Sequence, residues 1–469
     1  MKKITPAISR GLLISSAFVA VSASAQTTTS KLPNIIYILA DDLGYNDLSC
    51  YGQKKFQTPN IDALAQDGMT FLQHYAGTTV SAPSRCALMT GYHTGHAPIR
   101  GNGNEKLPEG TFDMSLPANS TTVADIVKQK NYATACIGKW GMGGPGTQGH
   151  PNKHGFDYFY GYLGQGHAHF YYPQELWENE TRVTLNKEKY SPDLMMEKTV
   201  NFITENKDKP FFLYFSTTIP HAELIIADEY MIEEGKYHEE KAYVGNHYGS
   251  QERPHAAFVS MVQKLDGDVG KIRQLLKDLG IDDNTLIIFT SDNGPHMEGG
   301  ADPDFFDSNG PFTGYKRDLY DGGIRVPFIT CMPGKIKAGQ ISDHISAFWD
   351  FLPTVCDLTG QKAPQGIDGI SYMPEMFGQK QKKHDYLYWE FHEQGGKQAV
   401  RQGQWKAVKR NVSREDNPVL ELYDLNSDPA ERHNVAYKFP EQAKKMDEII
   451  RKAHVSDPKW KLLKSERQK

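Results

Sequence analysis

Two apolar runs of the sequence end in side chains that carry oxygen ligands. One run stops at Asp41 and Asp42, and a later run is followed by Asp292 and Asn293. Three carboxylates and an amide held in a small volume repel one another unless a cation lies between them. Hard oxygen ligands of this kind bind Ca²⁺ or Mg²⁺. The sequence therefore predicts a divalent metal site, although either pair alone is more typical of a polar loop cap.

A second group of candidate residues lies in the segment VSAPSRCALMTG, residues 80–91. Pro83 is tolerated in the first turn of a helix, and Gly91 is typical of a helix end. Ser81 would then lie at a helix start, where free backbone N–H groups stabilise anions. Arg85, about one turn later, would point back to the same opening. Without further information, a serine in this place is more often a helix cap than a nucleophile.

These side chains require a sheet whose strands end at one edge. Strands alternating with helices predict an α/β fold, in which a mainly parallel, mixed sheet is sandwiched by helices. Ligands bind such sheets outside the carboxyl ends of the strands. The expected strands are 31–40, 211–216, 285–290 and 326–330, and the expected helices are 60–69, 192–205, 256–279 and 345–358.

A smaller second unit is predicted at the C-terminus. Residues 379–383 are polar, and the short segments after them are rich in aromatic and β-branched residues, which favours an antiparallel sheet. A single hydrophobic core stops growing at roughly 250 to 300 residues, which supports two units. We expect a catalytic domain over 26–378 and a subdomain over 379–469. Within the subdomain the expected strands are 386–391, 399–408 and 420–425, and the expected closing helix is 441–453.

The N-terminus is typical of an export signal. Three basic residues precede an apolar run at 11–21, which ends in the small residues of 23–25. The run is too short to cross a bilayer, and no later stretch approaches the ~20 apolar residues of a membrane span. We expect residues 1–25 to be removed, which leaves a soluble protein in the periplasm or otherwise exported. A buried N-terminal helix is the alternative.

The composition excludes several classes of protein. The 469-residue chain carries 52 basic and 57 acidic side chains, a formal charge of −5, so it lacks the basic character of nucleic-acid binders. Its 39% hydrophobic and 23% charged residues are ordinary for a globular protein and argue against disorder. The five cysteines form no CxxC pair, which argues against a disulfide framework or a zinc cluster and predicts mostly buried thiols.

The segment 81–91 resembles the signature of the type I, formylglycine-dependent sulfatases of the alkaline phosphatase superfamily. In that signature Cys or Ser is followed by x, Pro, Ser and Arg and, further on, by Thr and Gly. The resemblance covers nearly all of the chain after the expected signal peptide. The other motifs occur in the family's order: PNIIYILADDLGYNDL from residue 33, GKW at 138–140, SDNG at 291–294, DGGIRVP at 321–327 and ELYDLNSDPAERHN at 421–434.

The resemblance implies an alkaline phosphatase-like fold and the hydrolysis of sulfuric esters. Ser81 would be oxidised after synthesis to Cα-formylglycine, an aldehyde that exists as a hydrate. One hydroxyl of the hydrate attacks sulfur, and the other later expels sulfate, whereas an unmodified serine would be trapped as a stable ester. The implied Ca²⁺ ligands are Asp41, Asp42, Ser81, Asp292 and Asn293.

The same resemblance assigns roles to four further side chains. Arg85 would steady the modified residue, and Lys139 and Lys316 would clamp sulfate oxygens, which stabilises charge in the transition state. His221, alone or together with Lys316, would protonate the leaving alkoxide, a step that typically contributes about 10² to 10⁴ in rate.

Two positions depart from the more common pattern of the family. Ser81 stands where Cys is more frequent, so its oxidation would need the serine-type, radical-type sulfatase-maturating enzyme of bacteria. The family often carries a His in GKWH that assists sulfate elimination, and that position is Gly141 here. His167 and His169, in the segment GHAHFYYP, are candidate replacements.

The segment 167–177 crowds aromatic rings with polar groups, as in pockets that bind sugars. We expect His167, His169, Tyr171 and Trp177 to contact a sulfated glycan, of galactose or N-acetylgalactosamine type by resemblance. A loop packed on the core is the alternative. Two rival functions stay open: a phosphate-ester hydrolase of the same superfamily, which needs ligands for a second metal, and a non-catalytic glycan-binding protein on a sulfatase scaffold.

Overall fold

The computed structural model describes residues 1–3, 31–108, 110–233, 235–237 and 241–468. Residues 32–469 form one compact unit. Residues 4–25 of the expected signal peptide lie outside the described residues. Within the described ranges no helix combines the length and the apolar character needed to cross a bilayer. The five cysteines are free thiols, and all but Cys50 are buried, as predicted.

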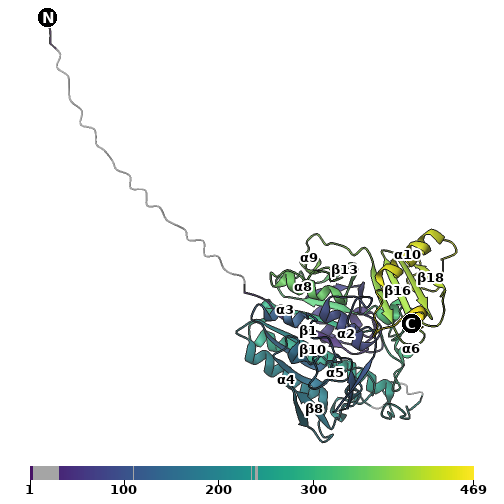
Figure 1. The fold of residues 1–469 in the computed structure, drawn as a ribbon. Coiled ribbons are helices and arrows are strands. Elements are labelled where there is room, and N and C mark those ends of the chain that lie inside the picture. The colour runs from purple at the N-terminus through teal and green to yellow at the C-terminus, as the bar shows by residue number, and fades with distance from the viewer. Residues whose placement is uncertain (4–30, 109, 234, 238–240, 469) are drawn as a thin grey trace. The chain divides into compact units, whose positions relative to one another are not determined.

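A ten-stranded mixed sheet forms the centre of the compact unit (Figure 1). From one edge to the other its strands are β13 (Gln340–Ser342), β2 (Met69–Phe71), β12 (Phe328–Cys331), β11 (Thr285–Ser291), β1 (Asn34–Ala40), β10 (Phe211–Ser216), β6 (Ala133–Lys139), β7 (Tyr158–Tyr162), β8 (Glu175–Glu178) and β9 (Thr181–Thr184). The central strands from β11 to β7 are parallel to one another, and antiparallel pairs flank them. The mainly parallel, mixed sheet expected from the sequence is thereby confirmed.

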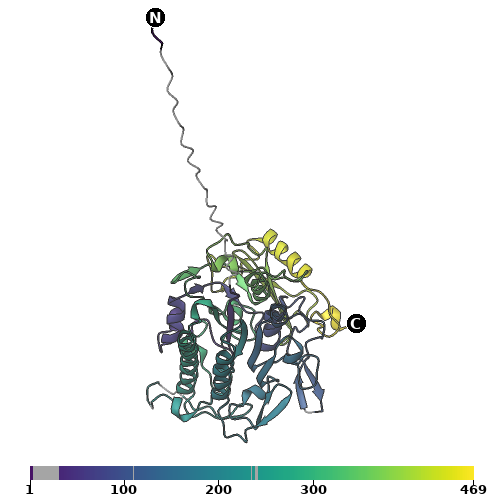
Figure 2. The same cartoon turned by 90° about the vertical axis from the view of Figure 1, so that its left-hand side faces the viewer.

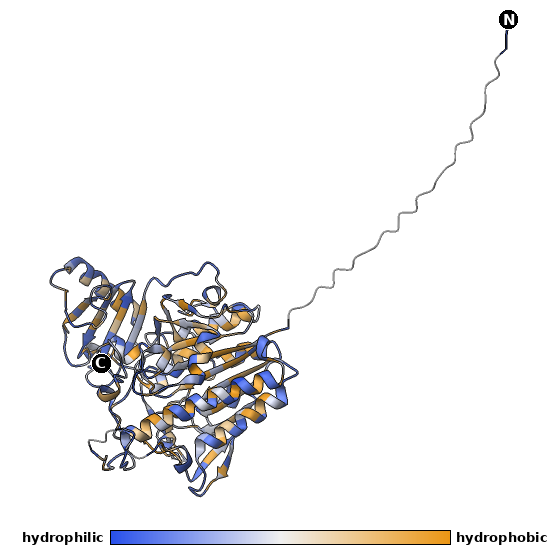
Figure 3. Ribbon diagram, turned by 180° about the vertical axis from the view of Figure 1, so that it is seen from behind, coloured by the Kyte–Doolittle hydropathy of each residue, from blue (hydrophilic) through white to orange (hydrophobic). Residues whose placement is uncertain are grey.

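Helices cover both faces of this sheet, which explains why β1 is an uninterrupted apolar run. Alternate residues of β1 point to opposite faces, so Ile36 and Ile38 pack with one layer of helices and Tyr37 with the other. The two long helices α4 and α5 run along the first face (Figures 2 and 3). The first layer contains α1 (Pro59–Gln66), α4 (Ser191–Asn206) and α5 (Pro254–Asp278), and the second contains α2 (Ser81–Thr90), α3 (Val123–Lys128) and α8 (Phe351–Leu358).

A separate, smaller sheet has four antiparallel strands in the order β15 (Leu387–Phe391), β16 (Lys397–Gln402), β17 (Trp405–Arg410) and β18 (Leu420–Asp424). One face packs against α10 (Pro440–Ala453), and the other packs against the segment that leads into α2. The domain boundary expected at 378–379 falls between α9 (Met373–Met376) and β15, and both lie within the single compact unit.

Two expected elements differ from the structure. The expected helix 345–358 begins only at Phe351, because residues 346–347 form β14 and pair with β3 (His74–Tyr75). Asp350 then accepts a hydrogen bond from the Ala347 N–H at 2.8 Å, which marks the turn into the helix. The expected strand 399–408 is two strands, β16 and β17, because Gly403 turns the chain with φ 57°.

Candidate active site

The central strands of the large sheet end at the same level. In the parallel register Ala40 of β1 lies beside Ser291 of β11, and on the other side of β1, Ser216 of β10 lies beside Gly138 of β6. The residues that follow each strand therefore meet at one edge of the sheet. They are Asp41 and Asp42 after β1, Asp292 and Asn293 after β11, and Lys139 at the end of β6.

The four predicted metal ligands from the strand ends are buried, and hydrogen bonds join three of them. The Asp42 N–H donates to Asp292 Oδ1 at 3.0 Å, and Asn293 Nδ2 donates to Asp42 Oδ1 at 2.7 Å. Asp42 has φ 63°, a left-handed conformation that Asp tolerates better than most residues. Asn293 Oδ1 is buried and has no hydrogen-bond partner among the described residues. An unpaired amide oxygen beside three carboxylates fits a hard divalent cation.

Helix α2 starts at this edge, as the segment 81–91 predicts. Ser81 Oγ donates to Asp41 Oδ1 at 3.2 Å and accepts from Lys139 Nζ at 3.2 Å. The N-cap position is Val80, without a side-chain cap, so Ser81 does not act as the helix cap. Gly91 ends the helix with φ 77°. The Ser81 hydroxyl is therefore turned toward the carboxylates and not toward its own helix.

Arg85 is fully buried and ties the helix to the carboxylates. Its Nη2 donates to Asp292 Oδ2 at 2.9 Å and lies 3.6 Å from Asp41 Oδ1. Burial alone would lower the pKa of Arg85, but Tyr214 and the two carboxylates more than offset it, so the pKa is raised. Burial, then repulsion from Asp41, raises the pKa of Asp292 to about 6. The guanidinium is thus a permanent cation that compensates part of the negative charge.

Lys316 and His221 contact each other beside Asp42. Lys316 Nζ donates to Asp42 Oδ2 at 2.8 Å and to His221 Nε2 at 3.0 Å. Burial, then the Lys316 ammonium, lowers the pKa of His221 well below its ordinary value, so the imidazole is neutral. Its Nδ1 donates to the carbonyl of Ala222, which leaves Nε2 as the acceptor. The imidazole lies between two others, with ring centroids 4.8 Å from His169 and 5.5 Å from His296.

Sequence reasoning missed His296, Glu298 and Arg317. Glu298 accepts from Lys316 Nζ at 3.0 Å and pairs with Arg317 at 2.7 Å. Burial would raise the pKa of Glu298, but Lys316 together with Arg317 and His296 outweighs it and lowers the pKa to about 2. A signal was present, since PHME follows SDNG directly and places two polar side chains at alternate positions after a strand end.

The predicted substrate contacts lie in different places. A cavity of about 360 Å³ opens over Ser81 and His221, and His169 lines it, whereas His167 and Trp177 line a neighbouring cavity. The expectation for Tyr171 needs correction. Its side chain is fully buried and its hydroxyl donates to the Thr218 and His221 carbonyls at 2.6 and 2.7 Å, so it supports the loop of His221 beneath the cavity.

The structure also shows the surroundings of Trp177 and of Gly141. The Arg182 guanidinium lies over the Trp177 ring at 5.0 Å, so that face is not open for stacking on a sugar. Gly141 has φ 74°, and a Cβ there would lie 3.0 Å from Gln165 Cγ. Gln165 therefore lies beside the position where the family often carries a His, and His169 is the imidazole of the segment that reaches the cavity over Ser81.

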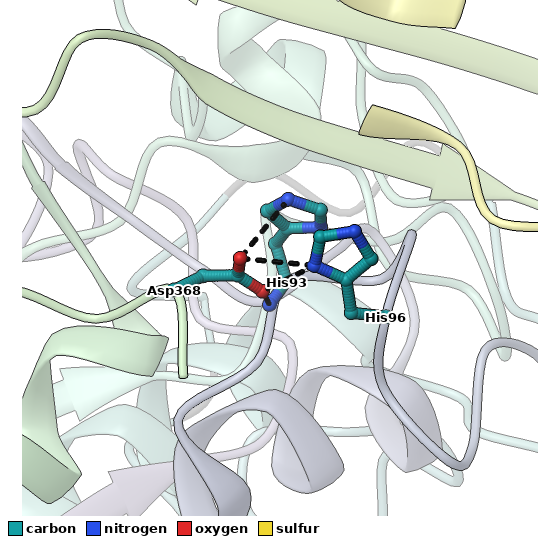
Figure 4. Close-up of side chains that lie close together, drawn as sticks. All are labelled: His93, His96 and Asp368. Carbon is teal, nitrogen blue, oxygen red and sulfur yellow. Dashed lines mark hydrogen bonds and ion pairs between the residues drawn. The ribbon is translucent and has the colours of Figure 1, made fainter. Parts of the chain in front are cut away.

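A second group of His and Asp side chains lies outside this site (Figure 4). Asp368 accepts from the His93 N–H at 3.0 Å and lies 2.9 Å from His96 Nδ1. The Gly95 N–H donates to His93 Nδ1 at 3.1 Å, so the proton of this imidazole lies on Nε2, 3.5 Å from Asp368. A cation would have to displace that proton. The group is therefore best described as a set of hydrogen bonds that joins two loops.

The fold and the site together define a hydrolase of the alkaline phosphatase-like class, with charged side chains gathered at the strand ends of a mixed sheet. The chain belongs to the sulfatase family, whose profile matches residues 33–361. A second profile, for the C-terminal part of N-sulphoglucosamine sulphohydrolase, matches residues 311–456. The protein is accordingly an enzyme that hydrolyses sulfate esters.

Individual relatives agree with this membership. The chain is 29% identical to an N-acetylgalactosamine-6-O-sulfatase of Bacteroides thetaiotaomicron, over 90% of this chain and 93% of that protein. It is 32% identical to the N-acetylgalactosamine-6-sulfatase of Rattus norvegicus, over 73% of this chain and 66% of that protein. Among solved structures, Ps i-CgsB in complex with k-i-k-neocarrahexaose superposes with a TM-score of 0.79 at 31% identity, covering 93% of this chain and 96% of the other.

Proposed function

We propose that the protein removes sulfate from a sulfated glycan by means of a Cα-formylglycine at position 81 and a Ca²⁺ ion. The observation that carries this proposal is the position of Ser81 Oγ, which contacts both Asp41 and Lys139 at the buried carboxylates. When formed, the aldehyde hydrate supplies one hydroxyl for attack and a second for release of sulfate.

The donor set supports a calcium ion. We propose that Asp41, Asp42, Asp292 and Asn293 hold it together with the modified side chain at 81. All four offer hard oxygens from buried side chains, and Asn293 Oδ1 lacks another partner among the described residues. Bound there, Ca²⁺ supplies positive charge that orients the ester oxygens.

Two lysines are placed to bind the sulfate group. Lys139 Nζ lies 2.6 Å from Asp41 Oδ2, and Lys316 Nζ lies 2.8 Å from Asp42 Oδ2, so each of these two carboxylates is paired with its own ammonium. Fixed cations of this kind stabilise charge that develops on equatorial oxygens. Lys316 also holds a proton 3.0 Å from His221 Nε2. This pair supplies a proton at the cavity floor, where the leaving alkoxide requires one.

The position of Lys316 also argues against the phosphate-ester alternative. Asp42, His296 and Glu298 lie close enough together to serve a second metal. The ammonium of Lys316, however, already bonds to Asp42 and Glu298, at 2.8 and 3.0 Å. A second divalent cation would have to displace this ammonium. A single metal and a fixed lysine favour the sulfate ester.

We propose a sulfated glycan of galactose or N-acetylgalactosamine type as the substrate. The bacterial and rat relatives are named as N-acetylgalactosamine-6-sulfatases, and the solved relative is a complex with k-i-k-neocarrahexaose. The cavity over Ser81 is lined largely by polar side chains, including His169 and Tyr248, which suits hydroxyl recognition. We further propose export of the protein and oxidation of Ser81 by a serine-type maturating enzyme.

The peptide that carries Ser81 provides the test. Produced with a serine-type maturating enzyme, the protein should show loss of two hydrogen atoms from this peptide by mass spectrometry. The same preparation should release sulfate from a sulfated galactan, and Ser81→Ala should abolish both. Full conversion of Ser81 without sulfate release from any glycan or aryl sulfate would overturn the proposal.

A further inference from the structure

A second cavity adjoins the one over Ser81. It has a volume of about 420 Å³. The two cavities share four lining residues, which makes them contiguous: Asn104, Asp113, Gln165 and Gly166. A ligand seated over Ser81 can therefore continue into the second cavity without leaving the protein surface.

The charges of the second cavity differ from those of the first. Its one guanidinium, Arg182, pairs with Glu175 at 3.2 Å. Asp113 adds a buried carboxylate, which accepts from the Gln165 N–H at 2.7 Å and from Gln165 Nε2 at 3.2 Å. Burial lowers the pKa of His167, so this side chain adds no positive charge at neutral pH. The lining thus carries two carboxylates against one guanidinium, and it repels an anionic group.

The other lining groups match an uncharged ring with hydroxyls. The amides of Asn104 and Gln165 and the imidazole of His167 donate and accept hydrogen bonds. Phe112, half-buried in the wall, adds an apolar surface. A few placed polar groups on a partly apolar wall are typical of a small-molecule site. In contrast, the first cavity sets two cations, Lys316 and Arg317, against the carboxylates of Glu298 and Asp113, so its lining carries no excess of negative charge.

We propose that the second cavity is a subsite for an uncharged sugar unit linked to the sulfated one. The substrate is then an oligosaccharide or a longer glycan whose neighbouring unit carries neither a carboxylate nor a second sulfate. This inference rests on the proposed sulfatase function and narrows its substrate class.

Gly166 offers a direct test, because it lines both cavities. Its φ of −60° and ψ of −33° are ordinary helical values, and a Cβ built there meets no described atom within 4 Å. Gly166→Leu should therefore fold and should fill the passage between the cavities. Gly267→Leu on α5 is the matched control, since a Cβ there also meets nothing within 4 Å among the described residues and the site lies elsewhere.

The measurement compares three substrates of the matured enzyme: the best sulfated monosaccharide, and the same unit linked to galactose or to glucuronate. We expect linkage to galactose to raise kcat/KM about tenfold and linkage to glucuronate to give no gain. Gly166→Leu should remove the gain, and Gly267→Leu should keep it. Equal gains for both neighbours, no gain for galactose, or a gain that survives Gly166→Leu would overturn the subsite.

A charge substitution tests the exclusion of anions independently. Glu175→Gln releases Arg182 from its ion pair, so the glucuronate-linked substrate should gain about tenfold in kcat/KM. Glu180→Gln makes the same charge change on an exposed residue outside the lining and should change nothing. An unchanged kcat/KM of Glu175→Gln for the glucuronate-linked substrate would contradict the charge argument. Hydrolysis of 4-nitrophenyl sulfate by all variants separates failure of the subsite from failure of the sulfatase proposal.

Discussion

At the scale of single residues, the site is a balance of buried charges. Asp41, Asp42 and Asp292 are opposed by Arg85, Lys139 and Lys316, and each carboxylate lies within hydrogen-bonding or ion-pair distance of one of these cations. Buried ions persist only when paired in this way. A divalent cation would add positive charge to a site that is already neutral in sum, and this favours an anionic ester.

Lys139 allows this balance to be tested. Lys139→Ala removes the ammonium that contacts both Asp41 and Ser81, so we expect kcat of the matured enzyme to fall by about 10² to 10³. Lys139→Arg, which keeps the charge, should recover part of the rate. Lys128→Ala, at an exposed ion pair on α3, is the control. A decrease in kcat of less than threefold in Lys139→Ala, measured with 4-nitrophenyl sulfate, would contradict the assigned role.

Calcium binding is a second prediction at this scale. A ligand that binds only the folded state stabilises it by mass action, by about 2.7 kcal/mol at a hundred times its Kd. Addition of Ca²⁺ should therefore raise the unfolding temperature of the unmodified protein, and Asp292→Asn should abolish the increase. Asp283→Asn, on an exposed turn before β11, should leave it intact. Differential scanning calorimetry with and without chelator measures the increase in unfolding temperature. An equal increase on addition of Ca²⁺ in all three proteins would contradict this ligand set.

At the scale of elements, the parallel register of β11, β1, β10 and β6 determines the site. Because these strands end level, side chains that are far apart in sequence meet without long loops. Helix α2 adds Ser81 and Arg85 from one short element. The C-terminal sheet fixes the approach to this helix: Thr78 Oγ1 donates to the Glu390 carbonyl at 2.7 Å, and Trp389 Nε1 donates to the Ala76 carbonyl at 3.0 Å.

Strand β15 also carries a charge pair that makes stability depend on pH. Glu390 is buried, and its Oε1 lies 2.6 Å from His454 Nδ1. Burial alone would lower the pKa of His454, but hydrogen bonds with Glu390 and Glu466 more than offset it, so the pKa is raised. A raised histidine pKa stabilises the fold below the ordinary value of about 6.5, and the contribution is lost as pH rises through the raised value.

His454→Gln should therefore lower the unfolding temperature most at about pH 6 and least at about pH 9. Thermal unfolding of both proteins across this range measures the difference. His433→Gln, at a largely exposed histidine, serves as the control and should show a small and constant effect. If the unfolding temperatures of His454→Gln and the parent protein differ by the same amount at every pH, this result would contradict the ion pair.

At the scale of the whole molecule, a buried ion cluster joins the C-terminal sheet to the rest. Lys406 Nζ of β17 lies 2.7 Å from Asp321 and 2.9 Å from Glu431, and all three side chains are fully buried. Asp321 also accepts from the Tyr75 hydroxyl at 2.8 Å. The small sheet is thus held by charge as well as by apolar packing, which agrees with the single compact unit of residues 32–469.

Removal of Lys406 should destabilise the whole unit. Lys406→Met removes the cation from the buried carboxylate of Glu431, whereas Asp321 keeps its ion pair with Arg325 at 3.2 Å. Removal of one partner of a buried ion pair typically lowers the free energy of unfolding by about 3 to 5 kcal/mol. We expect a single unfolding transition, at a lower denaturant concentration than in the parent protein. Tryptophan fluorescence monitors this transition. Lys409→Met, at a partly exposed pair on the same strand, should have a smaller effect. Two separate transitions in the parent protein would contradict the joint unit.

The sequence predicted the elements that position the site. Apolar runs that end in Asp41 and Asp292 mark central strands, because a strand covered on both faces must be apolar throughout. Pro83 and Gly91 mark the ends of α2 for equally local reasons. The split at Gly403 and the late start of α8 were missed, because a single glycine and a two-residue strand are weak local signals.

Other features were decided only by the tertiary structure. Nothing in the local pattern shows that Glu298 pairs with Lys316, that Arg182 covers Trp177, or that Tyr171 is buried beneath His221. The sequence by itself determined which side chains end each strand, because strand order and apolar pattern are properties of short segments. The packing of loops from distant parts of the chain determined which of those side chains touch and which face the cavity, since such contacts depend on the fold as a whole.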